Sequence, residues 1–234
     1  MKAVSILKAV LFAAAASGAA PSGASGEALI KTDGNGAYIS NPTGRMMGED
    51  LKDTLEALHE REAAGVPVVE SLPRGSSRGR KVLVAYFSWG GRTEGIAKSI
   101  SRGIGADLFR IERVPAYSSD YSEVIEQSRK ELDANVLPEI KGPLPNAAAY
   151  DILILGYPAW FYTAPLPVAR FLKSLDLKGK MVMPFMCSWS SKFEVSLPAL
   201  YVAAPGASFL KGLTLDRSAD EKAEVRAWLQ RGGF

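Results

Sequence analysis

The sequence predicts an α/β protein built on an open, doubly wound sheet of five parallel strands, with helices on both faces. Residues 81–96 pass from an apolar run through a glycine turn into a segment with helical periodicity, which indicates a strand, a tight loop and a helix. Strand-like and helix-like segments then alternate to residue 231, as in a parallel sheet wrapped by helices. The first and third strand-like segments have a continuous apolar core, as expected for strands buried on both faces.

The first two strands differ in how strongly their pattern indicates burial. Val82–Phe87 is apolar at every position, and the helix after it repeats isoleucine every four residues up to Ile104. One apolar stripe of that helix can therefore pack back on the strand. The second strand is predicted over Asp107–Glu112, with Leu108 and Phe109 directed inward.

The remaining units follow the same alternation. Tyr150–Pro158 has the apolar core of a buried strand, and the next helix begins at Pro165, where a missing N–H costs nothing. The fourth strand, Met181–Cys187, contains Pro184, which counts mildly against a fully paired interior position because proline cannot donate a backbone hydrogen bond. A fifth strand is predicted over 207–215. The other predicted helices are 119–132, 193–203 with a break near Pro198, and 219–231 with Trp228 in the core.

The N-terminal part is predicted to be organised differently. Residues 1–20 combine a short basic start, an apolar stretch and small residues, which is typical of an export signal; a buried N-terminal helix is the alternative. The stretch is too short for a stable membrane span. Residues 21–80 are predicted to be an extension with one helix over 49–64 and a linker over 71–80, and the main domain to cover 81–234. We therefore expect an exported protein, periplasmic or extracellular.

Composition excludes several other functions. The chain has 234 residues, 25.1 kDa and a formal charge of +3 without a block of like charges, so a nucleic-acid partner is not indicated. The sole cysteine, Cys187, has no internal disulfide partner and is expected to be a small buried residue rather than a nucleophile. His59 and Glu62 lie three apart, but the absence of another histidine favours a solvated helix face over a metal site. We assign no catalytic residue and no metal ligand.

Three predicted loops have an unusual composition. They follow the first, third and fourth strands and are called here the first loop (Ser88–Thr93), the second loop (Pro158–Ala164) and the third loop (Ser188–Phe193). If the spatial strand order is 2-1-3-4-5, the three strands are neighbours and the loops face one cleft at the carboxyl edge of the sheet.

The first loop has the chemistry of an anion site. Its hydroxyls and glycines precede a helix, whose first N–H groups lack partners and whose dipole places partial positive charge there. Taken alone, the same pattern also fits a tight turn that serves only packing.

The loops together resemble the flavodoxin family. The motifs are Val-Leu-Val-Ala-Tyr-Phe-Ser-Trp-Gly-Gly-Arg-Thr, Leu-Gly-Tyr-Pro-Ala-Trp-Phe and Phe-Met-Cys-Ser-Trp-Ser, and the second contains the Gly-x-Pro-x-Trp pattern of certain bacterial flavodoxin-like proteins. The resemblance covers about residues 81–232 and implies a flavodoxin-like 2-1-3-4-5 sheet that binds flavin mononucleotide (FMN) non-covalently. It places the phosphate in the first loop, Trp160 against or beside the flavin ring, and a second ring contact in the third loop. The implied FMN-binding residues are Ser88, Trp89, Gly90, Gly91, Arg92, Thr93, Pro158, Ala159, Trp160, Phe161, Ser188, Trp189, Ser190 and Lys192.

Several positions depart from the family pattern. A hydroxyl residue is usual where Gly90 stands and an asparagine where Arg92 stands, so one side-chain bond to the phosphate is lost and a charge is gained. Phe161 and Tyr162 stand where relatives often have glycine, which puts stabilisation of a one-electron reduced flavin in doubt. We expect Lys192 to lie near the N1/O2 side of the ring and to raise the two-electron potential, which a redox titration of Lys192→Ala tests.

These observations indicate an FMN-binding protein that acts in electron transfer or as a flavin-dependent oxidoreductase on a small acceptor such as a quinone. Its expected partners are FMN and either a redox protein or that acceptor. The alternative is a non-catalytic flavodoxin-fold binding or scaffold module that has lost tight flavin binding, which Gly90, Tyr162 and Trp189 favour.

Overall fold

The computed structural model describes residues 68–234, apart from residues 135, 144, 190 and 217–219, together with strands β1 (Lys31–Thr32) and β2 (Tyr38–Ile39). Strands β1 and β2 pair with each other in antiparallel fashion. The predicted export signal over 1–20 and the predicted helix over 49–64, which contains His59, lie outside the described residues.

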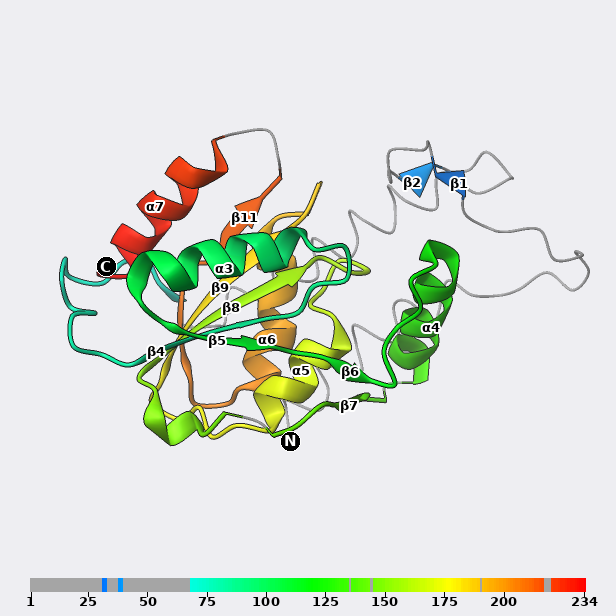
Figure 1. Cartoon of the computed structure of the whole chain (residues 1–234), viewed down its shortest axis with the longest axis horizontal. Helices are drawn as coiled ribbons and strands as arrows, with labels where there is room; N and C mark the ends of the chain where they lie inside the picture. The colour runs from blue at the N-terminus through cyan, green and yellow to red at the C-terminus, as the bar shows by residue number, and fades with distance from the viewer. Residues whose placement is uncertain are drawn as a thin grey trace, which may run out of the picture.

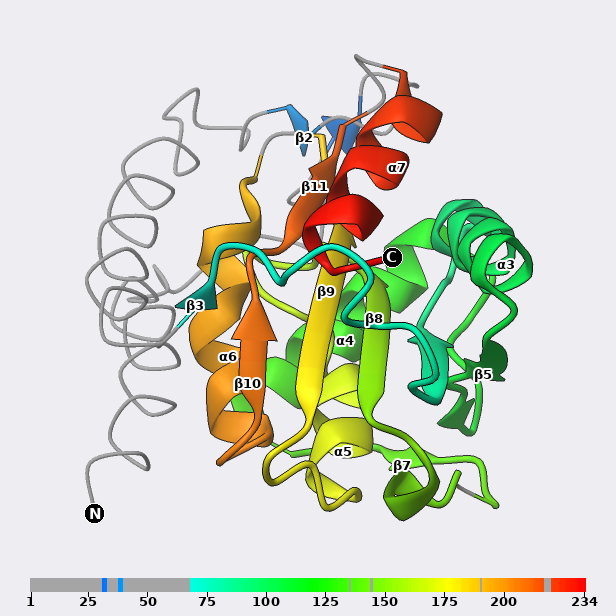
Figure 2. The same ribbon diagram turned by 90° about the vertical axis from the view of Figure 1, so that its left-hand side faces the viewer.

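A parallel sheet forms the centre of the protein (Figures 1 and 2). Its order is β3-β10-β9-β8-β4-β5, and β11 also pairs with β9. The five predicted strands therefore stand in the order 2-1-3-4-5, with the last strand in two pieces. Their bounds are β3 (Val68–Val69), β4 (Val82–Tyr86), β5 (Asp107–Arg110), β8 (Ile152–Pro158), β9 (Met181–Cys187), β10 (Ser208–Leu210) and β11 (Leu213–Leu215).

Helices cover both faces of this sheet (Figure 1). Side chains alternate along β4, so that Val84 packs toward α3 and α7 while Leu83 packs toward α5 and α6. Trp228 of α7 is fully buried, as the sequence predicts. The helices are α3 (Arg92–Ile104), α4 (Tyr121–Ala134), α5 (Leu166–Lys173), α6 (Leu197–Ala203) and α7 (Glu221–Arg231), with short 3₁₀ turns η1 (Ala147–Ala149) and η2 (Phe193–Ser196).

The fifth strand breaks beside Pro184. β10 pairs with Met181 and Val182, and β11 resumes the pairing at Phe185. Three residues of the fifth strand, 210–212, thus stand against two residues of β9, 183 and 184, so the fifth strand has one extra residue here, as in a β-bulge. Pro184 in β9 has no backbone N–H to donate. The hydrogen bonds between β9 and the fifth strand are therefore interrupted at this residue.

The predicted linker over 71–80 packs against the C-terminal residues. Val68 and Val69 pair with β10, the Leu72 N–H donates to the Arg231 carbonyl at 2.7 Å, and the buried Ser77 hydroxyl donates to the Gly232 carbonyl at 2.6 Å. The sheet therefore includes residues on the N-terminal side of position 81. A composition rich in Pro, Gly and Ser does not show that its backbone groups have partners elsewhere in the chain.

Two local expectations for the second strand differ from the structure. Leu108 is 40% exposed rather than directed inward, because β5 is an edge strand of the sheet. The chain after it forms β6 (Arg113–Val114), which pairs in antiparallel fashion with β7 (Glu139–Ile140) and was not predicted. Each of these strands has only two residues, which is too short for the alternation of apolar and polar residues that predicts a strand.

None of the helices in the described part of the chain has both the length and the apolar composition needed to cross a lipid bilayer.

Gly156 in the middle of β8 provides a test of this packing. A Cβ at this position would lie 2.2 Å from the Phe185 ring, and interior side chains have little room to move. We expect Gly156→Ala to lower the free energy of unfolding by about 1–3 kcal/mol, measured by urea denaturation followed by circular dichroism. Gly103→Ala in α3, where a Cβ meets nothing within 4 Å, is the control and should raise it by about 0.5–1 kcal/mol; equal effects at the two positions would contradict the packing argument.

Candidate cofactor site at the carboxyl edge of the sheet

The register of the central strands brings the three loops to one edge. Tyr86 at the end of β4 lies opposite Gly156, and Pro158 at the end of β8 lies opposite Cys187. The Ala159 N–H donates to the Cys187 carbonyl at 2.9 Å, so the second and third loops begin side by side.

The first loop is a glycine turn that leads into α3. The Ser88 hydroxyl is buried and accepts a hydrogen bond from the Gly91 N–H at 3.1 Å. Gly91 has φ +83°, a left-handed conformation that glycine adopts without strain. No side chain caps α3 in the described structure, so the N–H groups of its first turn remain available to an anion.

Trp89 connects the first loop to the segment before α4. Its indole N–H donates to the Ser118 carbonyl at 2.8 Å, and its ring lies 6.0 Å from that of Tyr121 at the start of α4. One side of the loop is thereby attached to a neighbouring element.

Arg92 is directed toward the end of the fifth strand. Its Nη1 donates to the Leu215 carbonyl at 3.0 Å, and its Nη2 pairs with the Glu221 carboxylate in the first turn of α7. Part of the guanidinium is thus used inside the protein. The other hydrogen-bond donors of the loop include its backbone N–H groups and the hydroxyls of Ser88 and Thr93, whose side chains are buried.

The second loop contains a turn in an unusual conformation. The N–H groups of Trp160 and Thr163 each donate to the other's carbonyl at 3.0 Å. Phe161 and Tyr162 between them have φ values of +50° and +58°. Positive φ at both central positions belongs to a type I′ turn, which favours Asn-Gly, and bulky residues hold it at a cost of roughly 1–2 kcal/mol each.

Trp160 belongs to an aromatic cluster. Its ring meets that of Phe87 edge to face, with centroids 5.2 Å apart, and that of Tyr117 at 5.3 Å. These contacts fix the orientation of a half-buried indole next to the three loops.

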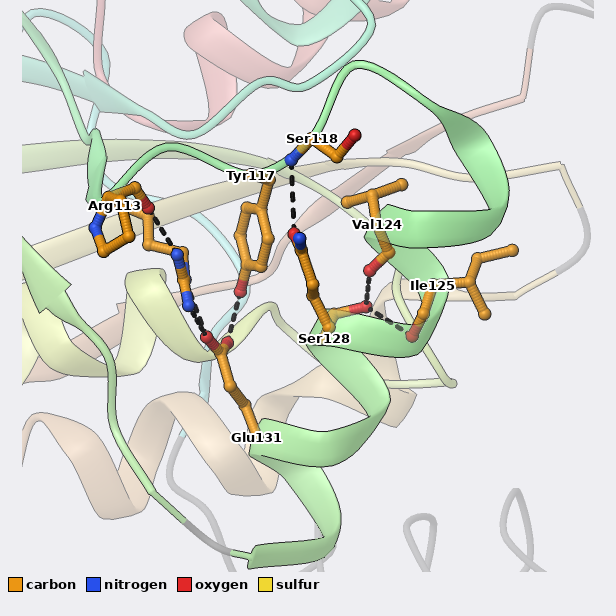
Figure 3. Close-up of polar contacts among 9 residues, drawn as sticks. Arg113, Tyr117, Ser118, Val124, Ile125, Ser128 and Glu131 are labelled. Atoms are coloured by element: carbon orange, nitrogen blue, oxygen red, sulfur yellow. Dashed lines mark hydrogen bonds and ion pairs between the residues drawn. The ribbon is translucent and has the colours of Figure 1, made fainter.

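A polar network supports Tyr117 from beneath (Figure 3). The Tyr117 hydroxyl donates to Glu131 of α4, which also pairs with Arg113 at 2.6 Å. The Arg113 guanidinium lies 4.6 Å from the centroid of the Tyr117 ring. Burial, and then the hydrogen bond to the Glu131 carboxylate, raise the pKa of Tyr117 above its usual range. The sequence pattern does not reveal this contact, because Tyr117 and Glu131 lie 14 residues apart on different elements.

The third loop is held at its start by two hydrogen bonds of Ser188. The Ser188 N–H donates to the Leu215 carbonyl at 3.1 Å, and the buried Ser188 hydroxyl accepts from the Ser191 N–H at 2.9 Å. The side chains of Trp189, 64% exposed, and Lys192 reach the surface. Ser190, also predicted as a site residue, lies outside the described residues.

Tyr157 supports the far end of the third loop and was not identified from the sequence. Its hydroxyl lies 2.8 Å from that of Ser196, and both side chains are fully buried. The Ser196 hydroxyl donates to the Phe193 carbonyl at 2.8 Å. Burial raises the pKa of Tyr157 above its usual range, so this phenol stays neutral.

Among the described residues, no group of three His, Cys, Asp or Glu side chains is placed to hold a metal ion.

The fold defines the class: an open doubly wound α/β protein, a class in which ligands bind beyond the carboxyl ends of the central strands. The sequence profile described as Flavodoxin matches residues 81–232. The chain belongs to the flavodoxin family, which confirms the resemblance noted in its loop motifs.

Known proteins resemble parts of the chain. Flavodoxin 1 of Escherichia coli K12 is 31% identical over 101 residues, which cover 42% of this chain and 43% of that protein, so the match spans less than half of the curated relative. A candidate flavoprotein from Bacteroides eggerthii is 36% identical with a TM-score of 0.57, over 64% of this chain and 96% of that one. A flavoprotein from Lactobacillus acidophilus solved in complex with FMN is 22% identical with a TM-score of 0.53, over 64% and 99%, and shows the shared fold.

The strained turn of the second loop should make a glycine variant more stable than an alanine variant, which is the reverse of the usual order. Phe161→Gly and Phe161→Ala lose the same ring contacts, but only glycine adopts a positive φ without strain. We therefore expect Phe161→Gly to be the more stable by about 1 kcal/mol, measured by urea denaturation. At the exposed strand position Leu108, the alanine variant should instead be the more stable; an alanine preference at Phe161 as well would show that the turn is not strained.

Proposed function

We propose that the chain binds FMN at the three loops and uses it in electron transfer or as a flavin-dependent oxidoreductase on a small acceptor such as a quinone. The observation that carries the proposal is the convergence of an uncapped helix N-terminus and a fixed tryptophan at one sheet edge. Membership of the flavodoxin family supports the same ligand.

The first loop fits a phosphate monoester. A Cβ added at Gly90 or Gly91 would meet nothing within 4 Å, so the backbone is open to a ligand at this turn. Phosphate is dianionic near neutral pH and is stabilised by several N–H donors at a helix N-terminus. In this proposal the first turn of α3 and the Thr93 hydroxyl hold the phosphate.

The second and third loops would hold the flavin ring. Trp160 offers an aromatic face or edge in a fixed orientation, and the exposed Trp189 can cover the ring from the third loop. Bound FMN supplies the one- and two-electron redox chemistry. The protein orients the ring and limits its access to water.

A small acceptor suits the charge of this chain better than a basic protein partner. Association of redox proteins through complementary charge requires a strongly charged surface. The formal charge here is only +3. A neutral planar acceptor that takes up two electrons and two protons, as a quinone does, needs no such surface.

Export is a separate proposal, supported by the composition of residues 1–20. FMN would then have to be acquired outside the cytoplasm if the chain crosses the membrane unfolded. N-terminal sequencing of the protein recovered from the periplasm or medium tests it, and recovery of the uncleaved chain in the cytoplasm alone would contradict it.

Flavin titration of the full chain tests the cofactor proposal. We expect FMN to bind with quenched fluorescence, and riboflavin, which lacks the phosphate, to bind at least about tenfold more weakly because charge-assisted hydrogen bonds are lost. Trp160→Ala should weaken both ligands by roughly tenfold. Tyr201→Ala in α6, remote from the three loops, is the control and should change neither affinity.

Redox competence is measured on the same FMN-loaded protein. After anaerobic reduction with dithionite, added benzoquinone should restore the oxidised flavin spectrum. A chain that leaves FMN fluorescence unquenched at saturating concentration would instead support the non-catalytic binding or scaffold module.

A further inference from the structure

We propose that Arg92 is a positioning residue that couples the first loop to the third loop through the carbonyl of Leu215. Glu221 holds the Arg92 guanidinium in place. The inference rests on the proposed FMN site, because it concerns how two of its loops are held relative to each other. It differs from the expectation that the positive charge of Arg92 serves the phosphate directly.

One carbonyl group connects the two loops. The Leu215 oxygen, at the end of β11, accepts from Nη1 of Arg92 at 3.0 Å and from the N–H of Ser188 at 3.1 Å. Arg92 is the first residue of α3, and Ser188 is the first residue of the third loop. A displacement of either residue therefore strains a bond to the same acceptor.

Glu221 fixes the other side of the guanidinium. It is the first residue of α7, whose N-terminus is capped by Asp220 through bonds to the N–H groups of Lys222 and Ala223 at 3.1 and 3.3 Å. A carboxylate is favoured at a helix N-terminus. The Arg92 and Glu221 side chains are 18% and 33% exposed, so solvent and salt screen the pair less than an ion pair at the surface.

The geometry requires arginine rather than any cation. A guanidinium is planar and presents its N–H donors as a rigid fork, so separate nitrogens reach the Leu215 carbonyl and the Glu221 carboxylate at once. A lysine ammonium keeps the charge but lacks the fork. Because the Glu221 carboxylate also offsets the charge of Arg92, little of its attraction is left for a phosphate.

The coupling extends into the third loop through Ser188. Its hydroxyl accepts from the Ser191 N–H at 2.9 Å, so a displacement of Ser188 is transmitted to Ser191. Phe193, at the far end, is held separately by the Thr214 hydroxyl at 2.8 Å. The Arg92 link thus controls the half of the loop that is proposed to reach the flavin ring.

The test compares FMN with riboflavin in the full-length protein. We expect Arg92→Gln, Arg92→Lys and Glu221→Gln each to weaken both ligands by a similar factor, roughly three- to tenfold, and to leave the ratio of the two affinities unchanged within about twofold. The double variant Arg92→Gln/Glu221→Gln should bind each flavin no more weakly than the more affected single variant, because both substitutions remove the same link to Leu215. Lys98→Gln, which removes a cation from the exposed side of α3, is the control for charge and should alter neither affinity.

Hydrogen–deuterium exchange of the flavin-free protein gives a second readout. Amide uptake across 188–191 should rise in all three single variants and stay unchanged in Lys98→Gln, since loss of the Leu215 link loosens the loop. If Arg92→Gln fails to fold, Glu221→Gln and Arg92→Lys provide the same comparison.

A phosphate-binding role for Arg92 gives the opposite results. It predicts a selective loss of FMN affinity, rescue by lysine, little effect of Glu221→Gln and unchanged exchange in the third loop, and this set would overturn the proposal. If the wild-type chain binds neither flavin, the proposed function fails, while exchange across 188–191 still decides whether Arg92 couples the two loops.

Discussion

The common edge formed by β4, β8 and β9 is the constraint on which the site depends. Their parallel register fixes where each strand ends, because a shift of one residue would exchange the two faces of a strand that is buried on both. Tyr86 therefore lies opposite Gly156, and Pro158 opposite Cys187. The loops that follow have to emerge together, and the residues within them are brought together by hydrogen bonds made deep in the sheet.

Sequence patterns were sufficient for the central strands β4, β8 and β9, because burial on both faces leaves a continuous apolar run, but they did not identify β3. They also placed Trp228 in the core, since it recurs with other apolar residues on one helix. Patterns failed where partners are distant: Arg92 and Glu221 are 129 residues apart, and nothing in either segment indicates the other. The prediction that Leu108 is directed inward was wrong for a different reason. An edge strand can have an apolar residue that no other layer of the protein covers.

The second loop combines rigidity with local strain. Reciprocal hydrogen bonds close the turn around Phe161 and Tyr162, and aromatic contacts hold Trp160 on the side toward the sheet. Strained backbone persists where the surroundings over-determine it, and here the surroundings include the network of Tyr117, Glu131 and Arg113. A glycine in this turn would permit the backbone to change conformation easily. Two bulky residues restrict the backbone, and the contacts around them hold the strained conformation, so the turn would be better suited to keep the flavin ring of the proposed cofactor in place than to change shape with it.

The first loop is also held in one conformation by contacts within the protein. Where the family usually has an asparagine able to contact a phosphate, this chain has an arginine whose donors reach Leu215 and Glu221. The arginine adds a hydrogen bond from the first loop to the Leu215 carbonyl, which also accepts from Ser188 of the third loop. Binding of a phosphate would then depend on backbone N–H groups and the helix dipole, which are fixed by α3 itself. In the proposed site such donors would need little reorganisation when a ligand arrives, which would offset the loss of one direct contact.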